Sequence, residues 1–189
     1  MTTFNSPAFD SLRRCACHLG WGALLWSAVA AHATEAAHVH GLMRLDIAVE
    51  QSTLTLQLEA PLDSLLGFER APRTAAERQA ADALLKQMGH GATLFKPDAA
   101  AQCSLTQARI DSPVLQAAAP TAQGAGHEHA DLDASYEFRC AHPAQLTGIE
   151  VGLFEAFPRL QKIEVQMAGA KQQSKQTLQR PNKQLTLPR

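Results

Sequence analysis

The sequence has few aromatic residues and no excess of charge of either sign, and both features exclude classes of protein. Aromatic residues make up 5% of the 189 residues, and 17 Lys and Arg oppose 18 Asp and Glu for a net charge of -1. A nearly neutral chain has no broad basic surface to neutralise phosphates, so we expect no nucleic-acid partner. Hydrophobic residues still make up 46% of the chain, which is enough for one modest globular domain.

The N-terminus carries the parts of a secretory signal peptide. Arg13 and Arg14 precede an uncharged run that ends in Ala31-His32-Ala33, with small residues at the positions that signal peptidase reads. We expect cleavage after Ala33, which leaves residues 34–189 as one exported domain. A lasting membrane span is the less favoured alternative, because histidine interrupts the run.

Cleavage would leave only two of the four cysteines, Cys103 and Cys140. Two cysteines in an oxidising compartment predict a disulfide, and we expect it to close the base of a flexible loop between them. A Cys/Cys/His metal site is the alternative. It is disfavoured because neither cysteine has the Cys-x-x-Cys partner of structural zinc sites.

Apolar alternation predicts strands along most of the exported chain. Residues 42–59 fit an antiparallel hairpin, because Leu45 and Ile47 alternate with polar residues before the turn and Leu54 and Leu56 do so after it. A Thr-x-x-Glu capping box at Thr74 opens a predicted amphipathic helix over 74–88.

Further strands are expected at 94–95, 103–110, 134–140, 149–153 and 163–167, with a final hairpin built on Leu178, Leu185 and Leu187. Ala, Pro, Gly and Gln dominate 112–133, which predicts a flexible loop. The fold class is therefore α+β, with a predominantly antiparallel β-sheet, one main amphipathic helix and a flexible His-containing loop.

Two His-x-His pairs are the main candidates for metal binding. His38 and His40 immediately precede the first strand, where side chains at positions i and i+2 share a face and can bind one ion. His127 and His129 flank Glu128 in the predicted loop, with Asp131 and Asp133 behind them. Imidazole together with carboxylate suits zinc better than calcium or Cu(I). A solvated pair with no metal is the alternative at each position.

Glu69 is a further candidate ligand if the hairpin brings it near the first pair. Pairing of Glu69 with Arg70 or Arg73 is the simpler account of the same residue. His90 and His142 are isolated in the sequence, so we expect surface or capping roles for them.

Several motifs together resemble the ZrgA-like family of zinc-regulated periplasmic proteins, long catalogued as a domain of unknown function. The resemblance rests on His-x-His-Gly at 38–41, on the strand pair at 45–61, and on Leu-Leu-Gly-Phe-Glu at 65–69. The Phe95 to Cys103 segment and Leu-Phe-Glu-Ala-Phe-Pro at 153–158 complete it. It implies a periplasmic zinc-binding protein that assists zinc acquisition beside an ABC-type importer. Relatives often carry a longer His-rich stretch, and many have histidine where this chain has Arg70.

Other functions fit the sequence less well. A zinc hydrolase would need an open metal position, but the chain has no His-Glu-x-x-His, Gly-x-Ser-x-Gly or Ser/His/Asp arrangement, so we expect no enzyme. A copper carrier would need clustered sulfur, whereas Met43, Met88 and Met167 are far apart in the sequence. A structural or interaction domain with incidental histidines is the remaining alternative.

Overall fold

A computed structural model of the chain describes residues 40–116, 130–169 and 171–188. Its first two strands, β1 (Leu42–Glu50) and β2 (Thr53–Pro61), form the predicted antiparallel hairpin, with Arg44 opposite Glu59. Gln51 in the turn takes a left-handed conformation with a φ of 53°. The short turn fixes the register of the two strands along the hairpin.

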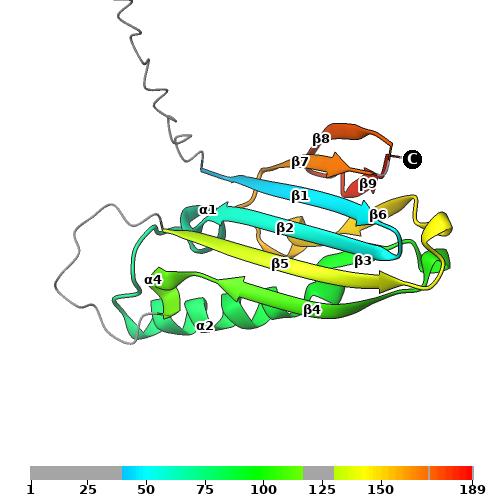
Figure 1. Cartoon of the computed structure of the whole chain (residues 1–189). Helices are drawn as coiled ribbons and strands as arrows, with labels where there is room; N and C mark the ends of the chain where they lie inside the picture. Colours follow the sequence, from blue (N-terminus) through cyan, green and yellow to red (C-terminus); the bar gives the residue numbers. More distant parts are fainter. Residues whose placement is uncertain (1–39, 117–129, 170, 189) are drawn as a thin grey trace, which may run out of the picture. The chain divides into compact units, whose positions relative to one another are not determined.

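The hairpin lies at the centre of a six-stranded sheet with the order β4-β5-β2-β1-β7-β8 (Figure 1). β1 and β7 run parallel, and every other neighbouring pair in this sheet is antiparallel. This arrangement confirms the α+β fold class with a predominantly antiparallel sheet. The remaining strands of the sheet are β4 (Cys103–Asp111), β5 (Asp131–Cys140), β7 (Lys162–Ala168) and β8 (Gln173–Gln179).

A second, three-stranded sheet has the order β3-β6-β9. Its strands are β3 (Phe95–Pro97), β6 (Gly148–Val151) and β9 (Gln184–Thr186). The predicted final hairpin is wrong, because β8 pairs with β7 in the large sheet whereas β9 pairs with β6 in the small one. Both segments bury a leucine, but they bury it through different sheets.

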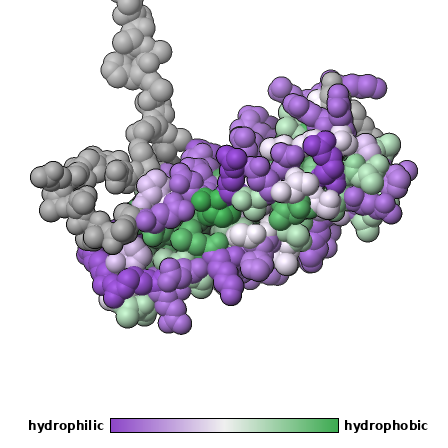
Figure 2. Space-filling view, turned by 60° about the horizontal axis from the view of Figure 1, so that its bottom comes forward, coloured by the Kyte–Doolittle hydropathy of each residue, from purple (hydrophilic) through white to green (hydrophobic). Residues whose placement is uncertain are grey.

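The hydrophobic core lies on one face of the large sheet. On β1, Met43, Leu45 and Ile47 are buried, while Arg44 and Asp46 between them are exposed. The same core cluster includes side chains from the main helix and from the small sheet. Figure 2 shows hydrophobic side chains gathered in the middle of the face it displays, with hydrophilic side chains around them. Some hydrophobic side chains are therefore exposed on the face of the molecule that Figure 2 displays.

The main helix, α2 (Ala75–Gly89), has the predicted capping box. The Thr74 side chain accepts a hydrogen bond from the Glu77 backbone N–H, and the Glu77 carboxylate accepts one from the Thr74 backbone N–H. Figure 1 shows this helix running along β4. Shorter helices are α1 (Leu62–Leu66), α3 (Gly91–Leu94), α4 (Pro113–Gln116), α5 (Leu153–Ala156) and the 3-10 turns η1 (Ala99–Ala101) and η2 (Pro143–Gln145).

Tyr136, the one tyrosine of the chain, joins the large sheet to the end of α2. Its hydroxyl donates to the backbone carbonyl of Met88 at 2.8 Å, and its ring centroid lies 5.1 Å from that of Phe95. A Cβ atom at Gly91 would lie 2.4 Å from the tyrosine ring, so only glycine leaves room for this packing. Burial raises the pKa of the tyrosine well above its ordinary value.

The loop predicted at 112–133 is wrong at its two ends. Residues 113–116 form α4, and β5 begins at Asp131, so both ends of the predicted loop are regular structure. The buried Ser112 hydroxyl donates to the backbone carbonyl of Asp131 at 2.8 Å, which joins these two ends. Residues 117–129 lie outside the described part of the chain.

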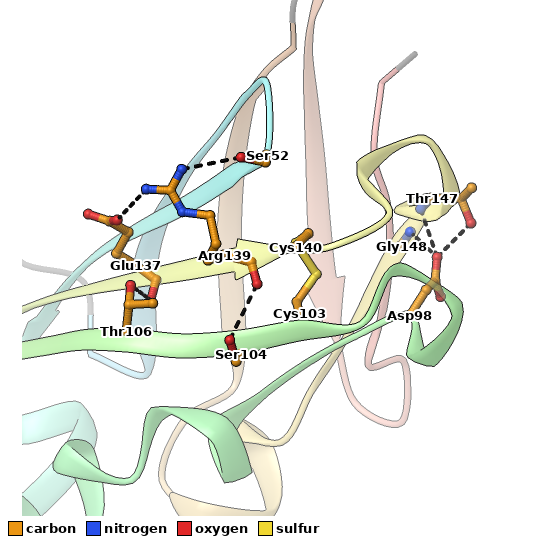
Figure 3. The surroundings of a disulfide bond; sticks show 10 residues. All are labelled: Ser52, Asp98, Cys103, Ser104, Thr106, Glu137, Arg139, Cys140, Thr147 and Gly148. Atoms are coloured by element: carbon orange, nitrogen blue, oxygen red, sulfur yellow. Dashed lines mark hydrogen bonds and ion pairs between the residues drawn. A yellow bond between two sulfur atoms is a disulfide. The ribbon is translucent and has the colours of Figure 1, made fainter.

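The predicted disulfide between Cys103 and Cys140 is present (Figure 3). These two residues lie directly opposite each other on β4 and β5. We expected this disulfide to close the base of the loop between the two strands, and that expectation is wrong. The chain passes from Asp111 to Asp131 at the other end of this pair of strands. The disulfide instead joins the start of β4 to the end of β5. At the same end of the sheet, the Arg139 side chain donates to the Ser52 hydroxyl in the turn between β1 and β2.

The segment with the Leu-Phe-Glu-Ala-Phe-Pro motif is held by Arg180, at the end of β8. The guanidinium donates to the backbone carbonyls of Phe154, Phe157 and Leu160, and it lies 5.2 Å from the centre of the Phe154 ring. A charged donor thereby reaches three backbone carbonyls of this segment, one of which, that of Phe157, also accepts from the Leu160 N–H. The motif thus has a structural explanation, because its residues pack the segment that joins α5 to β7.

Candidate metal site

His40 lies two residues before the start of β1, and its exposed side chain makes one hydrogen bond. Its Nδ1 lies 2.6 Å from Oδ2 of Asp63, in the first turn of α1. The imidazole is 70% exposed, whereas the Asp63 carboxylate is 27% exposed. The carboxylate is therefore the sheltered partner of the pair, and the imidazole faces solvent.

The backbone beside His40 is fixed by a buried hydroxyl. Ser64 is fully buried, and its Oγ accepts from the Gly41 N–H at 2.9 Å and donates to the Leu42 carbonyl at 3.2 Å. The Gly41 carbonyl accepts from the N–H groups of Gln161 and Lys162. Gly41 has a φ of 75°, and a Cβ atom there would lie 2.9 Å from Gln161, so the turn needs glycine.

Helix α1 also contacts the start of β5. The Leu62 N–H donates to the Ala130 carbonyl at 2.8 Å, one residue before Asp63 in the sequence. Ala130 is the first residue described after the segment that carries His127, Glu128 and His129. The five-residue helix α1 therefore holds two points of the chain that are 90 residues apart, residue 40 and residue 130.

Carboxylates gather on the solvent face of the sheet at this end. Asp133 on β5 lies opposite Glu59 on β2 and opposite Asp111 on β4. Partial burial, together with repulsion from Glu59, Asp131 and Asp111, raises the pKa of Asp133. Arg44 faces Glu59 at 3.5 Å across the hairpin and offsets part of this negative charge. The end of the sheet beside His40 thus has an excess of negative charge.

The structure brings only part of the predicted site into view. His38, His127, Glu128 and His129 lie outside the described residues. Within the ranges described, no group of three or more His, Cys, Asp or Glu side chains is arranged to hold a metal ion. A complete coordination shell built on His40 would therefore need ligands from the undescribed segments.

Glu69 is exposed, and within the described ranges it makes no hydrogen bond or ion pair. The predicted pairing of Glu69 with Arg70 or Arg73 is therefore wrong, and both terminal guanidinium nitrogens of Arg70 bond instead to Glu77, at 2.7 and 3.0 Å. Arg70 also lies over the Phe68 ring at 5.0 Å. Arg70 therefore joins the Phe68 segment to the start of α2.

Asp63 was not among the residues that the sequence pattern predicted. A signal for it exists in the hairpin register, where Arg44 lies opposite Glu59. In this antiparallel register, the partner's number rises by one for each residue towards the N-terminus of β1. Continuing the count from Arg44 and Glu59 places residue 40 opposite residue 63. A short turn at Gln51-Ser52 would have been enough to make this inference.

The sequence matches the family described as ZrgA family zinc uptake protein over residues 37–187. This match covers most of the chain, so the protein belongs to the ZrgA family of zinc uptake proteins. The comparison with curated proteins finds no match. No helix in the described ranges is long and apolar enough to cross a membrane.

Proposed function

We propose that this protein binds zinc in the periplasm and assists its delivery to an ABC-type zinc importer. Membership of a zinc uptake family supports the metal, and the signal-peptide pattern of residues 1–33 supports the compartment. The family match begins at residue 37, four residues after the proposed cleavage point. A disulfide between the two remaining cysteines fits an oxidising compartment. The role requires no catalysis.

The observation that carries the proposal is the arrangement of His40. An exposed imidazole whose backbone is held by hydrogen bonds at the next residue, Gly41, and whose one ring nitrogen is bonded to a carboxylate, is the usual arrangement of a zinc-binding histidine. Ligands on fixed backbone lose less conformational entropy when the ion binds. The nearby carboxylates would together favour a divalent cation over an anion, although each exposed one contributes little alone.

The remaining ligands are proposed from the sequence. His38 shares the His-x-His spacing with His40, and His127, Glu128 and His129 precede the residue that α1 holds beside it. The two segments therefore join the described fold on either side of one short helix, which favours zinc binding at this end of the sheet. Glu69 stays a candidate ligand because it is exposed and unpaired within the described ranges.

A direct test uses the exported chain without an affinity tag. After metal is removed with a chelator, zinc is titrated by calorimetry, and calcium and magnesium are titrated in parallel. We expect saturable zinc binding, no comparable calcium or magnesium binding, and loss of the zinc signal when His38, His40, His127 and His129 are all replaced by alanine. The matched control replaces the isolated histidines His90 and His142. A wild-type protein that binds no zinc would refute the proposal, and so would equal losses in the control.

A further inference from the structure

We propose that Asp63 is a positioning residue that fixes the imidazole of His40 so that Nε2 is its metal-binding atom. The inference rests on the proposed zinc-binding function and adds to it a residue that does not itself bind the ion. It follows from the hydrogen bond between the two side chains and from the way each is held.

The tautomer of His40 follows from the chemistry of its partner. An ionised carboxylate only accepts hydrogen bonds, so the contact between Nδ1 and Oδ2 at 2.6 Å requires the proton on Nδ1. In the neutral ring, Nε2 then carries the free lone pair. Zinc binds this lone pair, and a carboxylate on the opposite nitrogen makes it more basic.

Asp63 is well placed to orient the ring because its own helix is anchored. The next residue, Ser64, is fully buried and bonds to the Gly41 and Leu42 backbone, and the preceding Leu62 donates to Ala130. The Asp63 carbonyl accepts from the N–H of Gly67, the left-handed residue that ends α1 with a φ of 84°. The carboxylate therefore projects from a segment held on both sides.

The neighbouring carboxylates do not share this role. Glu59, on the same end of β2, faces Arg44 across the hairpin, and Asp133 is surrounded by other carboxylates. Glu69 makes no bond within the described ranges. Over those same ranges, Asp63 is the one hydrogen-bond partner of the His40 ring. Among the carboxylates that the structure describes, Asp63 is therefore the one that fixes this imidazole.

The test uses two measurements on the exported chain with all disulfides intact. First, nitrogen NMR of the metal-free protein at pH 8 reads which ring nitrogen of His40 carries the proton. The signal is assigned by its loss in H40A. Second, a competing chelator dye measures zinc affinity. Both are applied to wild type, D63A, D63E and the control E59A, which removes one negative charge at the same end of the sheet.

We expect a single tautomer with the proton on Nδ1 in wild type and in E59A, and a mixture of tautomers in D63A. D63A should bind zinc about 10- to 100-fold more weakly, the usual effect of losing an orienting partner. D63E should recover part of the affinity because it restores an acceptor. E59A should stay within about threefold of wild type, since exposed charge pairs contribute little.

A mixture of tautomers in wild type would overturn the inference whether or not zinc binds, and so would an unchanged tautomer in D63A. The first measurement needs no metal, so failure of the zinc-binding proposal is distinguished from failure of this one. Equal zinc affinity in D63A and wild type would also overturn it. If D63A does not fold, the wild-type tautomer and D63E still decide the outcome.

Discussion

At the scale of single residues, the structure of the His40 turn depends on Ser64 more than on any charge. Its hydroxyl satisfies a buried N–H and a buried carbonyl on the strand that follows the histidine. A surface ion pair contributes roughly 0–1 kcal/mol, whereas an unsatisfied buried polar group costs about 1–3 kcal/mol. The small polar side chain therefore matters more for this turn than the neighbouring Arg44–Glu59 pair.

We predict that S64A lowers the free energy of unfolding by about 1–3 kcal/mol, because the Gly41 N–H loses its buried acceptor. Urea denaturation followed by circular dichroism measures this change. The control is S104A, in which an exposed hydroxyl loses a long contact of 3.5 Å to the Arg139 carbonyl. This control should change stability by less than about 0.5 kcal/mol. Equal effects in the two variants would show that the buried hydroxyl has no special role.

Glu77 is the residue whose charge matters most to the start of α2. Hydrogen bonds from Arg70, then from the Arg73 backbone N–H, lower the pKa of its carboxyl to about 2 from an ordinary value of 4.5. A carboxyl group with a lower pKa in the folded state stabilises the fold above the unfolded-state pKa. That contribution is lost as pH falls from about 4.5 towards 2.

We therefore predict that E77Q is less stable than wild type at pH 7, and that the difference shrinks as pH falls from about 4.5 to 2. Thermal unfolding across this pH range measures both quantities. E69Q serves as the control because Glu69 is exposed and unpaired in the described ranges, and it should follow the wild-type profile. A difference between E77Q and wild type that does not depend on pH would contradict the assigned cause.

At the scale of secondary structure, local patterns were enough for some elements and not for others. The hairpin of β1 and β2 and the capping box of α2 depend on residues close in sequence, so alternation and spacing predicted them. The pairing of β9 with β6 is non-local. A three-residue strand with one buried leucine has no pattern that selects its partner, so the predicted final hairpin was wrong.

The same limit explains the misplaced disulfide. The two cysteines flank the predicted loop in the sequence, which suggested that they close it. In a pair of antiparallel strands, the residues farthest in sequence from the connecting loop pair at the end opposite that loop. Cys103 and Cys140 are such residues. The cysteine pairing could be predicted from the count alone, but its place in the fold required the strand register.

We predict that the exported chain, residues 34–189, has no free thiols when it is denatured without reductant, and that replacing both of its cysteines by serine lowers its stability by about 4 kcal/mol. This figure is the chain-entropy estimate for a loop with a sequence separation of 37 residues. Thiol labelling and urea denaturation check the two parts. Reductant should destabilise wild type and leave the double variant unchanged. Two reactive thiols in unreduced protein would contradict the account.

At the scale of the whole molecule, the chain places its candidate zinc chemistry and its disulfide at opposite ends of the large sheet. Residue 40, α1 and residue 130 meet at one end, and Cys103 and Cys140 bridge strands at the other. The sequence pattern indicated both histidine pairs, but only as two separate candidates. The bond from Leu62 to Ala130 adds what spacing could not predict, because it depends on how a five-residue helix folds back on two strands.

The most direct test of the zinc-binding account is the zinc affinity of H40A compared with that of H90A. His40 is the histidine of the proposed site that the structure describes, with an exposed side chain, and His90 is an exposed histidine at the C-terminal end of α2. A competing chelator dye measures both dissociation constants on the exported, tag-free chain. The account predicts that H40A binds zinc at least about tenfold more weakly than wild type, since even orienting partners of ligands have effects of this size, and that H90A binds as wild type does. Unchanged affinity in H40A would contradict it.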